Sequence, residues 1–113
     1  MIANNPLFLI PTLTGFIFII AGFIQYKFPP KSINAFYGYR TNKSMKNQKS
    51  WDFAQLYSSK LMMKLGLMLT FMGMIGLIYT PSEAIGAIIA VGLLIATLVT
   101  LSLMVENKLK KRN

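Results

Sequence analysis

The chain has 113 residues, of which 54% are hydrophobic and 13% charged, with 12 Lys and Arg against 3 Asp and Glu. Soluble domains usually carry about 25% charged residues, so this composition excludes a disordered chain and favours a membrane protein over a water-soluble one. Cys and His are absent from the sequence, which excludes disulfides, haem ligation, the usual zinc sites and thiol or imidazole catalysis. No cofactor and no metal site is expected.

Charged residues are missing from three long intervals, Met1 to Tyr26, Leu65 to Ser82 and Ala84 to Val105. A bilayer core of about 30 Å needs roughly 20 helical residues, so each interval can supply most of a membrane-spanning helix. We therefore predict an all-α integral membrane protein forming a single domain. Its three transmembrane helices are expected at about 7–28, 61–79 and 81–104, with a basic tail at 105–113.

Prolines mark the ends of the first predicted helix. Pro6 follows Asn5, as in a capped helix start, but Pro11 would remove a backbone donor and clash with the preceding turn. The helix therefore either kinks at Pro11 or starts there. Pro29 and Pro30 end it after Phe28.

The segment at about 29–60 is basic, polar and rich in aromatic residues. Thr41 or Ser44 can cap a short helix from about Met45 to Ser58, which we expect to lie at the membrane interface on the cytoplasmic side. At helical spacing, one stripe of this helix is expected to pack on protein while the other apolar face meets lipid. The stripe consists of Asn47, Trp51, Ala54 and Ser58.

The last two predicted helices are joined by Thr80-Pro81-Ser82-Glu83. This sequence reads as a capping box in which Thr80 caps and Glu83 reaches back, giving a tight antiparallel hairpin. All Lys and Arg residues lie between Lys27 and Lys64 or after Glu106. The positive-inside rule then predicts a multi-pass protein of the bacterial inner membrane, with the N-terminus outside and the C-terminus in the cytoplasm.

Small residues recur at helical spacing in all three predicted spans, for example Gly15 and Gly22, Gly66 and Gly73, and Gly92 with Ala96 and Thr100. Such residues let helix backbones approach closely in lipid, either within one three-helix unit or between copies in a homo-oligomer. No span has a charge near its centre, which argues against a proton relay or coupled transporter. The basic residues instead favour anionic membrane lipids as partners, and no nucleic acid is expected.

In the predicted cytoplasmic segment, the stretch Tyr37-Gly38-Tyr39-Arg40-Thr41 is followed by Ser44-Met45-Lys46-Asn47 and then by Trp51 and Ala54. This pattern closely resembles the signature of the SdpI (SdpI/YfhL) family of small bacterial membrane proteins. The family is named for an immunity factor against a secreted toxic peptide, which is also understood to signal to a cytoplasmic regulator. That immunity factor has more spans, and this chain matches chiefly its motif-bearing half. The resemblance lies within about Pro29 to Ser58.

Arg40 is the motif residue with the clearest binding chemistry, because a guanidinium presents a planar fork to carboxylate or phosphate. Its candidate partners are Asp52, the only acid of the segment, and a lipid phosphate. Either Arg40 ties the segment to the neighbouring helix, or residues from Gly38 to Asn47 form a docking surface for a lipid headgroup or a cytoplasmic partner.

Two classes of function follow. The resemblance implies a non-enzymatic protein that gives immunity to, or senses, a membrane-active toxic peptide. The alternative is an oligomeric channel, small transporter or lipid-handling protein assembled through the small-residue faces. An enzyme is not expected, because the three carboxylates are far apart in sequence and no His or Cys can serve as base or nucleophile.

Overall fold

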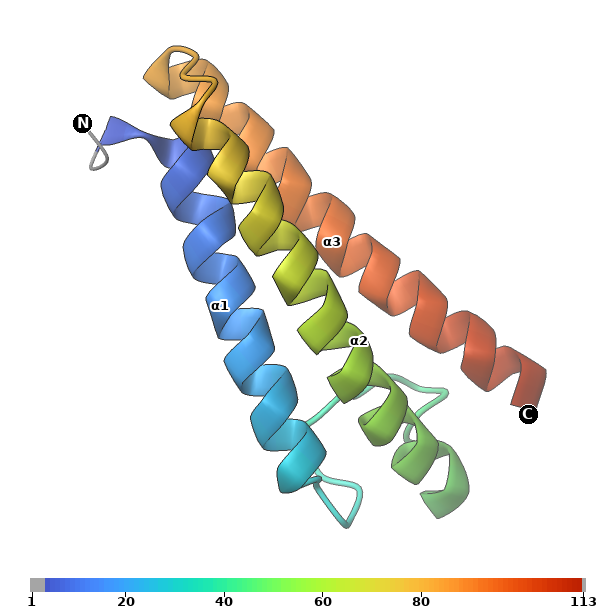
Figure 1. The fold of residues 1–113 in the computed structure, drawn as a ribbon. Helices are drawn as coiled ribbons and strands as arrows, with labels where there is room; N and C mark the ends of the chain where they lie inside the picture. The colour runs from blue at the N-terminus through green and yellow to red at the C-terminus, as the bar shows by residue number, and fades with distance from the viewer. Residues whose placement is uncertain (1–3, 113) are drawn as a thin grey trace.

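The computed structural model describes residues 4–112, which form three long helices and a short 3-10 helix, with no strand in that range. In Figure 1 the N-terminal end of α1 lies beside the turn between η2 and α3, and the segment joining α1 to α2 lies at the opposite end of the bundle. All three long helices have the length and composition to cross a membrane. The described chain is therefore all-helical, with three helices long and apolar enough to span a membrane. The elements are α1 (Pro6–Lys27), α2 (Gln48–Met74), η2 (Ile75–Leu77) and α3 (Glu83–Arg112).

α1 begins at Pro6, and Pro11 lies inside it. The side chain of Asn5 accepts a hydrogen bond from the backbone N–H of Phe8 at 3.3 Å, so Asn5 is the N-cap. Of the two alternatives for this helix, a start at Pro11 is therefore wrong. Pro11 is tolerated in the second turn, where only one intrahelical hydrogen bond depends on its missing N–H.

α2 is one continuous helix of 27 residues. Its N-cap is Asn47, whose side chain accepts from the N–H of Ser50 at 2.8 Å, and not Thr41 or Ser44. The separate interfacial helix expected within 29–60 is not observed, because its residues form the first turns of α2. No proline interrupts the sequence from Gln48 to Met74, so nothing in the backbone stops the polar turns from continuing into the apolar ones.

α3 begins two residues later and ends eight residues later than the predicted span. Ser82 caps its first turn, accepting from the N–H of Ile85 at 3.3 Å, so the capping box on Thr80 is wrong. The expected basic tail is largely helical because Val105 and Leu109 are buried. They form a core with Ala54 and Leu61 of α2.

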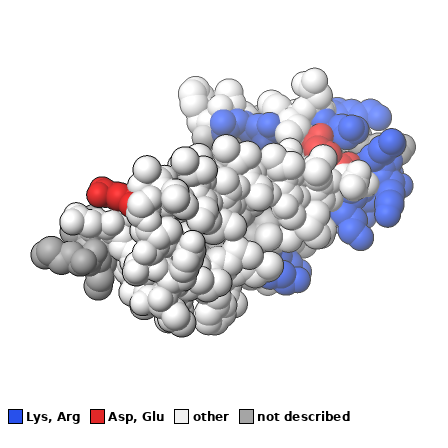
Figure 2. All heavy atoms as spheres, turned by 90° about the horizontal axis from the view of Figure 1, so that it is seen from above, with Lys and Arg blue, Asp and Glu red and all other residues white. Residues whose placement is uncertain are grey.

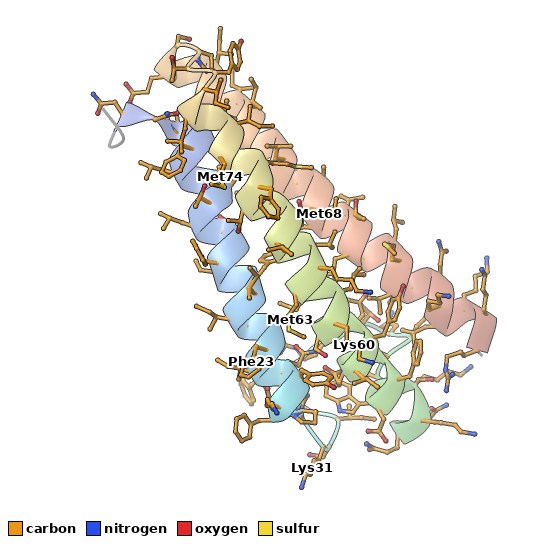
Figure 3. The ribbon with its side chains drawn as sticks, viewed as in Figure 1. Phe23, Lys31, Lys60, Met63, Met68 and Met74 are labelled. Atoms are coloured by element: carbon orange, nitrogen blue, oxygen red, sulfur yellow. The ribbon has the colours of Figure 1, made fainter. Side chains whose placement is uncertain are left out.

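Glycines set the distance between α1 and α2. A Cβ added to Gly22 would lie 2.8 Å from the carbonyl oxygen of Ser59, and one added to Gly76 would lie 2.6 Å from the backbone nitrogen of Phe8. Figure 3 shows Met63 between these two helices, consistent with its position 3.0 Å from the same added Cβ of Gly22. The small residues of α1 and α2 thus serve packing within one chain.

Candidate functional site

Residues 28–47, between α1 and α2, form the motif segment. The motif segment folds onto the bundle at the end away from the N-terminus (Figure 1). Its turn is at Gly38, whose φ of 100° lies in the left-handed region. A side chain there would meet Pro30 at 2.7 Å and the amide oxygen of Gln55. Both the backbone conformation and the close approach to α2 therefore require glycine.

Gln55 of α2 binds both backbone polar groups of Tyr39, the N–H and the carbonyl. Its Oε1 accepts from the Tyr39 N–H at 2.7 Å, and its Nε2 donates to the Tyr39 carbonyl at 2.8 Å. The residue is 1% exposed, so these two bonds satisfy polar groups that water cannot reach. Sequence reasoning missed Gln55, although a glutamine four residues after Trp51 and three before Ser58 lies on the same helical face as both.

Glu106 of α3 makes a second attachment to the same segment. One carboxylate oxygen accepts from the Tyr39 hydroxyl and from the Thr41 hydroxyl, each at 2.9 Å. Burial, together with the hydrogen bond to Glu106 and its negative charge, raises the pKa of Tyr39 from 10.0 to about 12. Glu106 was expected only at the start of a tail, and the helical continuation of α3 is what brings it to the motif.

Thr41 and Ser44 form a closed turn of their own. The N–H of Thr41 donates to Ser44 Oγ at 2.8 Å, and the N–H of Ser44 donates to Thr41 Oγ1 at 3.2 Å. Ser44 Oγ also lies 3.2 Å from the carbonyl oxygen of Tyr39 and is fully buried. These two motif residues therefore shape the segment instead of capping a helix.

The predicted stripe of α2 faces the protein interior. Trp51, Ala54 and Ser58 are fully buried, while Asn47 is exposed at the helix start. The indole Nε1 of Trp51 donates to the carbonyl oxygen of Pro30 at 2.7 Å. Trp51 thus fixes the chain where it leaves α1, and Ala54 contributes to the core shared with α3.

Arg40 and Asp52, paired as one possibility by the sequence, are not joined by an ion pair in the described part of the chain. Arg40 is exposed. Asp52 instead accepts from Gln48 Nε2 at 2.7 Å, one helical turn away. Tyr37, the remaining motif residue, donates its hydroxyl to the carbonyl oxygen of Phe28 at 2.6 Å and so also ties the segment to the end of α1.

Positive charge surrounds this end of the molecule. Figure 2 shows Lys and Arg side chains gathered at one end, while the middle of the visible face is uncharged. Lys43, Lys46 and Lys49 are exposed on or next to the motif segment. Arg112 stacks over Phe53, with its guanidinium carbon 4.2 Å from the ring centroid. The site therefore combines a hydrogen-bonded polar interior with an exposed cationic surface.

Comparison with known proteins agrees with this architecture. The sequence model of the SdpI/YfhL protein family matches residues 31–104, from the motif segment through most of α3. A protein of Bacillus subtilis (strain 168), described as uncharacterized protein YfhL, is 40% identical over 99 residues, covering 85% of this chain and 82% of the relative. No solved structure matches the chain. On the family match and this similarity, the chain belongs to the SdpI/YfhL family.

Proposed function

We propose that this protein is a non-enzymatic membrane protein that protects a bacterial membrane against, or senses, a membrane-active toxic peptide. The observation that carries the proposal is that two different helices hold the motif segment. Gln55 of α2 binds the backbone of Tyr39, and Glu106 of α3 binds the hydroxyls of Tyr39 and Thr41. A peptide that changes the spacing of α2 and α3 in the bilayer would have to break or move one of these attachments.

The contact proposed for such a peptide is a groove between the two helices. A shallow groove of about 150 Å³ lies between α2 and α3. Figure 3 shows Met68 on α2, and it lines this groove opposite Ala96 and Thr97 of α3. Methionines adapt to irregular partners, and the small residues opposite leave space for an inserted side chain.

The proposed orientation puts the motif segment in the cytoplasm. The Lys and Arg residues lie at the end of α1, in the segment between α1 and α2, in α2 as far as Lys64, and at the end of α3, and none lies in the turn at 78–82. By the positive-inside rule this places the cation-rich end inside and the N-terminus outside the inner membrane. Movement of the motif segment would then change the contacts that Arg40 and its neighbouring lysines make with a cytoplasmic regulator or with anionic lipids.

The experiment is survival of a sensitive bacterial host exposed to membrane-active peptides, with the native chain and its variants at equal membrane abundance. Arg40→Ala removes the exposed guanidinium, and Lys43→Ala is the matched control that removes one exposed positive charge from the same segment. Protection by the native chain and by Lys43→Ala, but not by Arg40→Ala, supports the proposal and assigns the readout to Arg40. Equal loss in both variants would instead indicate a diffuse basic surface.

Absence of protection against every peptide would favour an oligomeric channel, small transporter or lipid-handling protein. The specific observation behind this second candidate is the outer face of α3, where a Cβ added to Gly92 would have no atom within 4 Å. That glycine does not serve packing within the chain, and an open depression formed with Ile88, Val91 and Ile95 surrounds it. Solute flux through reconstituted liposomes, measured beside the cross-linked oligomeric state, tests this candidate.

A further inference from the structure

A second cavity, of about 340 Å³, lies where the end of α1 meets the first turns of α2. This volume is at the lower end of the range of roughly 300–1,000 Å³ found for small-molecule sites. Asp52 of α2, Gln25 and Tyr26 of α1, and Pro30 and Lys31 of the following segment all line it. The cavity is separate from the contacts of Tyr39 with Glu106, and we refer to it as the Asp52 cavity.

Two oxygen acceptors in the Asp52 cavity lack a full set of donors. Gln25 is 6% exposed, and its Nε2 is used on the protein side, donating to the Gln55 carbonyl at 2.9 Å and to Ser58 Oγ at 2.8 Å. Within residues 4–112 its Oε1 has no hydrogen-bond partner in the protein and is open to solvent. Asp52 receives a single donor there, Gln48 Nε2. A ligand that donates hydrogen bonds and carries positive charge fits this pair of acceptors.

Cations flank the acceptors. Lys31 lines the same cavity, and Figure 3 shows it at the tip of the segment after α1. The Nζ of Lys60 lies 5.9 Å from the centroid of the Tyr26 ring, which forms another wall. A ligand with a positive group beside a negative one matches this arrangement, whereas a bare metal cation would meet one carboxylate and be repelled by Lys31.

The lengths of the helices set the depth of the cavity. Asn5 Nδ2 donates to the Gly76 carbonyl at one end of α1, and Gln25 Nε2 donates to the Gln55 carbonyl at the other. α1 continues two residues past Gln25 to Lys27, so residues 48–52 of α2 project past it, by about 7 Å at 1.5 Å per residue. With 22 residues, about 33 Å, α1 is long enough to cover a hydrocarbon core of about 30 Å, which would put the projecting turns of α2 in the headgroup layer.

We propose that the Asp52 cavity binds the headgroup of an ethanolamine phospholipid. The primary ammonium donates to the Asp52 carboxylate and to Gln25 Oε1, and the phosphate lies toward Lys31 and Lys60. Phosphatidylcholine offers no N–H donor to these acceptors, and phosphatidylglycerol offers no positive charge to Asp52. The cavity thus selects among lipids, whereas the basic surface attracts any anionic lipid.

The chain carries its own reporter for this binding. Trp51 is the only tryptophan of the sequence, it is fully buried, and its Nε1 donates to the carbonyl oxygen of Pro30 in the cavity wall. The experiment is a titration of the full chain in detergent micelles with short-chain phosphatidylethanolamine, phosphatidylcholine or phosphatidylglycerol, followed by tryptophan fluorescence. We expect a saturable change with the ethanolamine lipid, at least about fivefold tighter than with either other lipid.

Asp52→Asn is the deciding variant, because its remaining Oδ1 still accepts from Gln48 and preserves the local fold. Loss of a charged hydrogen bond should weaken ethanolamine lipid binding by about tenfold. Glu83→Gln, which removes an acid at the start of α3 outside the cavity, is the matched control and should bind as the native chain does. Circular dichroism and the Trp51 emission without lipid verify that Asp52→Asn is folded.

Three results would overturn the proposal. The first is equal response of the native chain to all three lipids, and the second is unchanged selectivity in Asp52→Asn. The third is tighter Asp52-dependent binding of soluble phosphoethanolamine or of a lysine-containing peptide than of the lipid, which would assign the cavity to a soluble ligand. These outcomes are independent of the survival assay, so either proposal can fail alone.

Discussion

Gly15 of α1 and Gly66 of α2 face each other backbone to backbone. A Cβ added to either glycine would lie 2.6 Å from the carbonyl oxygen of the other. This reciprocal contact lies within the apolar part of both helices, where lipid provides no hydrophobic drive for association and close packing must hold the helices together.

Replacing Gly66 with alanine should therefore destabilise the α1–α2 pair by about 1–3 kcal/mol, because the obstructing atom is backbone and cannot rotate away. Gly92→Ala is the matched control, since its added methyl group would contact nothing within 4 Å. Denaturant unfolding in micelles, followed by circular dichroism, measures both. Equal effects of the two substitutions would show that helix propensity, and not the close contact between α1 and α2, determines the change in stability.

Gln55→Leu should release the motif segment from α2. Leucine keeps much of the side-chain volume but leaves the N–H and carbonyl of Tyr39 unpaired, at about 1–3 kcal/mol for a buried group. Hydrogen exchange of the Tyr39 amide should accelerate while the amides in the middle of α1 stay protected. Gln48→Leu serves as the control, because it replaces an exposed glutamine seven residues earlier in α2 that does not bind Tyr39. Unchanged exchange in Gln55→Leu would contradict the attachment.

Tyr39 should ionise at a higher pH than a free tyrosine side chain. Its pKa is raised to about 12, so the folded state holds the proton more tightly than the unfolded state, whose pKa is 10.0. The stabilisation from this group is fully present below pH 10 and is lost as the pH rises toward 12. Ultraviolet absorbance of tyrosinate should show a late step that is missing in Tyr39→Phe. Glu106→Gln should move that step to lower pH, and no movement would disprove the role of the carboxylate.

The sequence predicts the three spans well because the signal, absence of charge over about 20 residues, is local. The burial of Trp51 and Ala54 is predicted by helical spacing for the same reason. The beginning of α3 was misplaced because Thr80 and Ser82 can both cap, and only the fold selects Ser82. The continuity of α2 was missed because its composition changes from polar to apolar near Lys60, whereas its backbone stays helical through that point.

The polar attachments of the motif segment could not be predicted, since their partners are distant in sequence. Tyr39 and Glu106 are 67 residues apart, and they meet only because α3 continues past the apolar span. Similarly, Gln25 meets Ser58 across 33 residues. The motif read from the sequence therefore identified the family without identifying the residues that hold the segment in place.

Arg40→Ala and Trp51→Ala should differ sharply in stability, although both residues belong to the motif. Arg40 is exposed and unpaired with Asp52 in the described structure, so its truncation should change the free energy of unfolding by no more than about 0.5 kcal/mol. Trp51 is fully buried, and its truncation should cost about 3–5 kcal/mol. Thermal unfolding of both purified variants, with Trp51→Phe as an intermediate that keeps an aromatic ring, measures the difference. Because Trp51→Ala is expected to be strongly destabilised, only Arg40→Ala separates function from architecture in a survival assay. If Arg40→Ala unfolds as readily as Trp51→Ala, then Arg40 is an architectural residue and the exposed segment loses its best candidate for a docking contact.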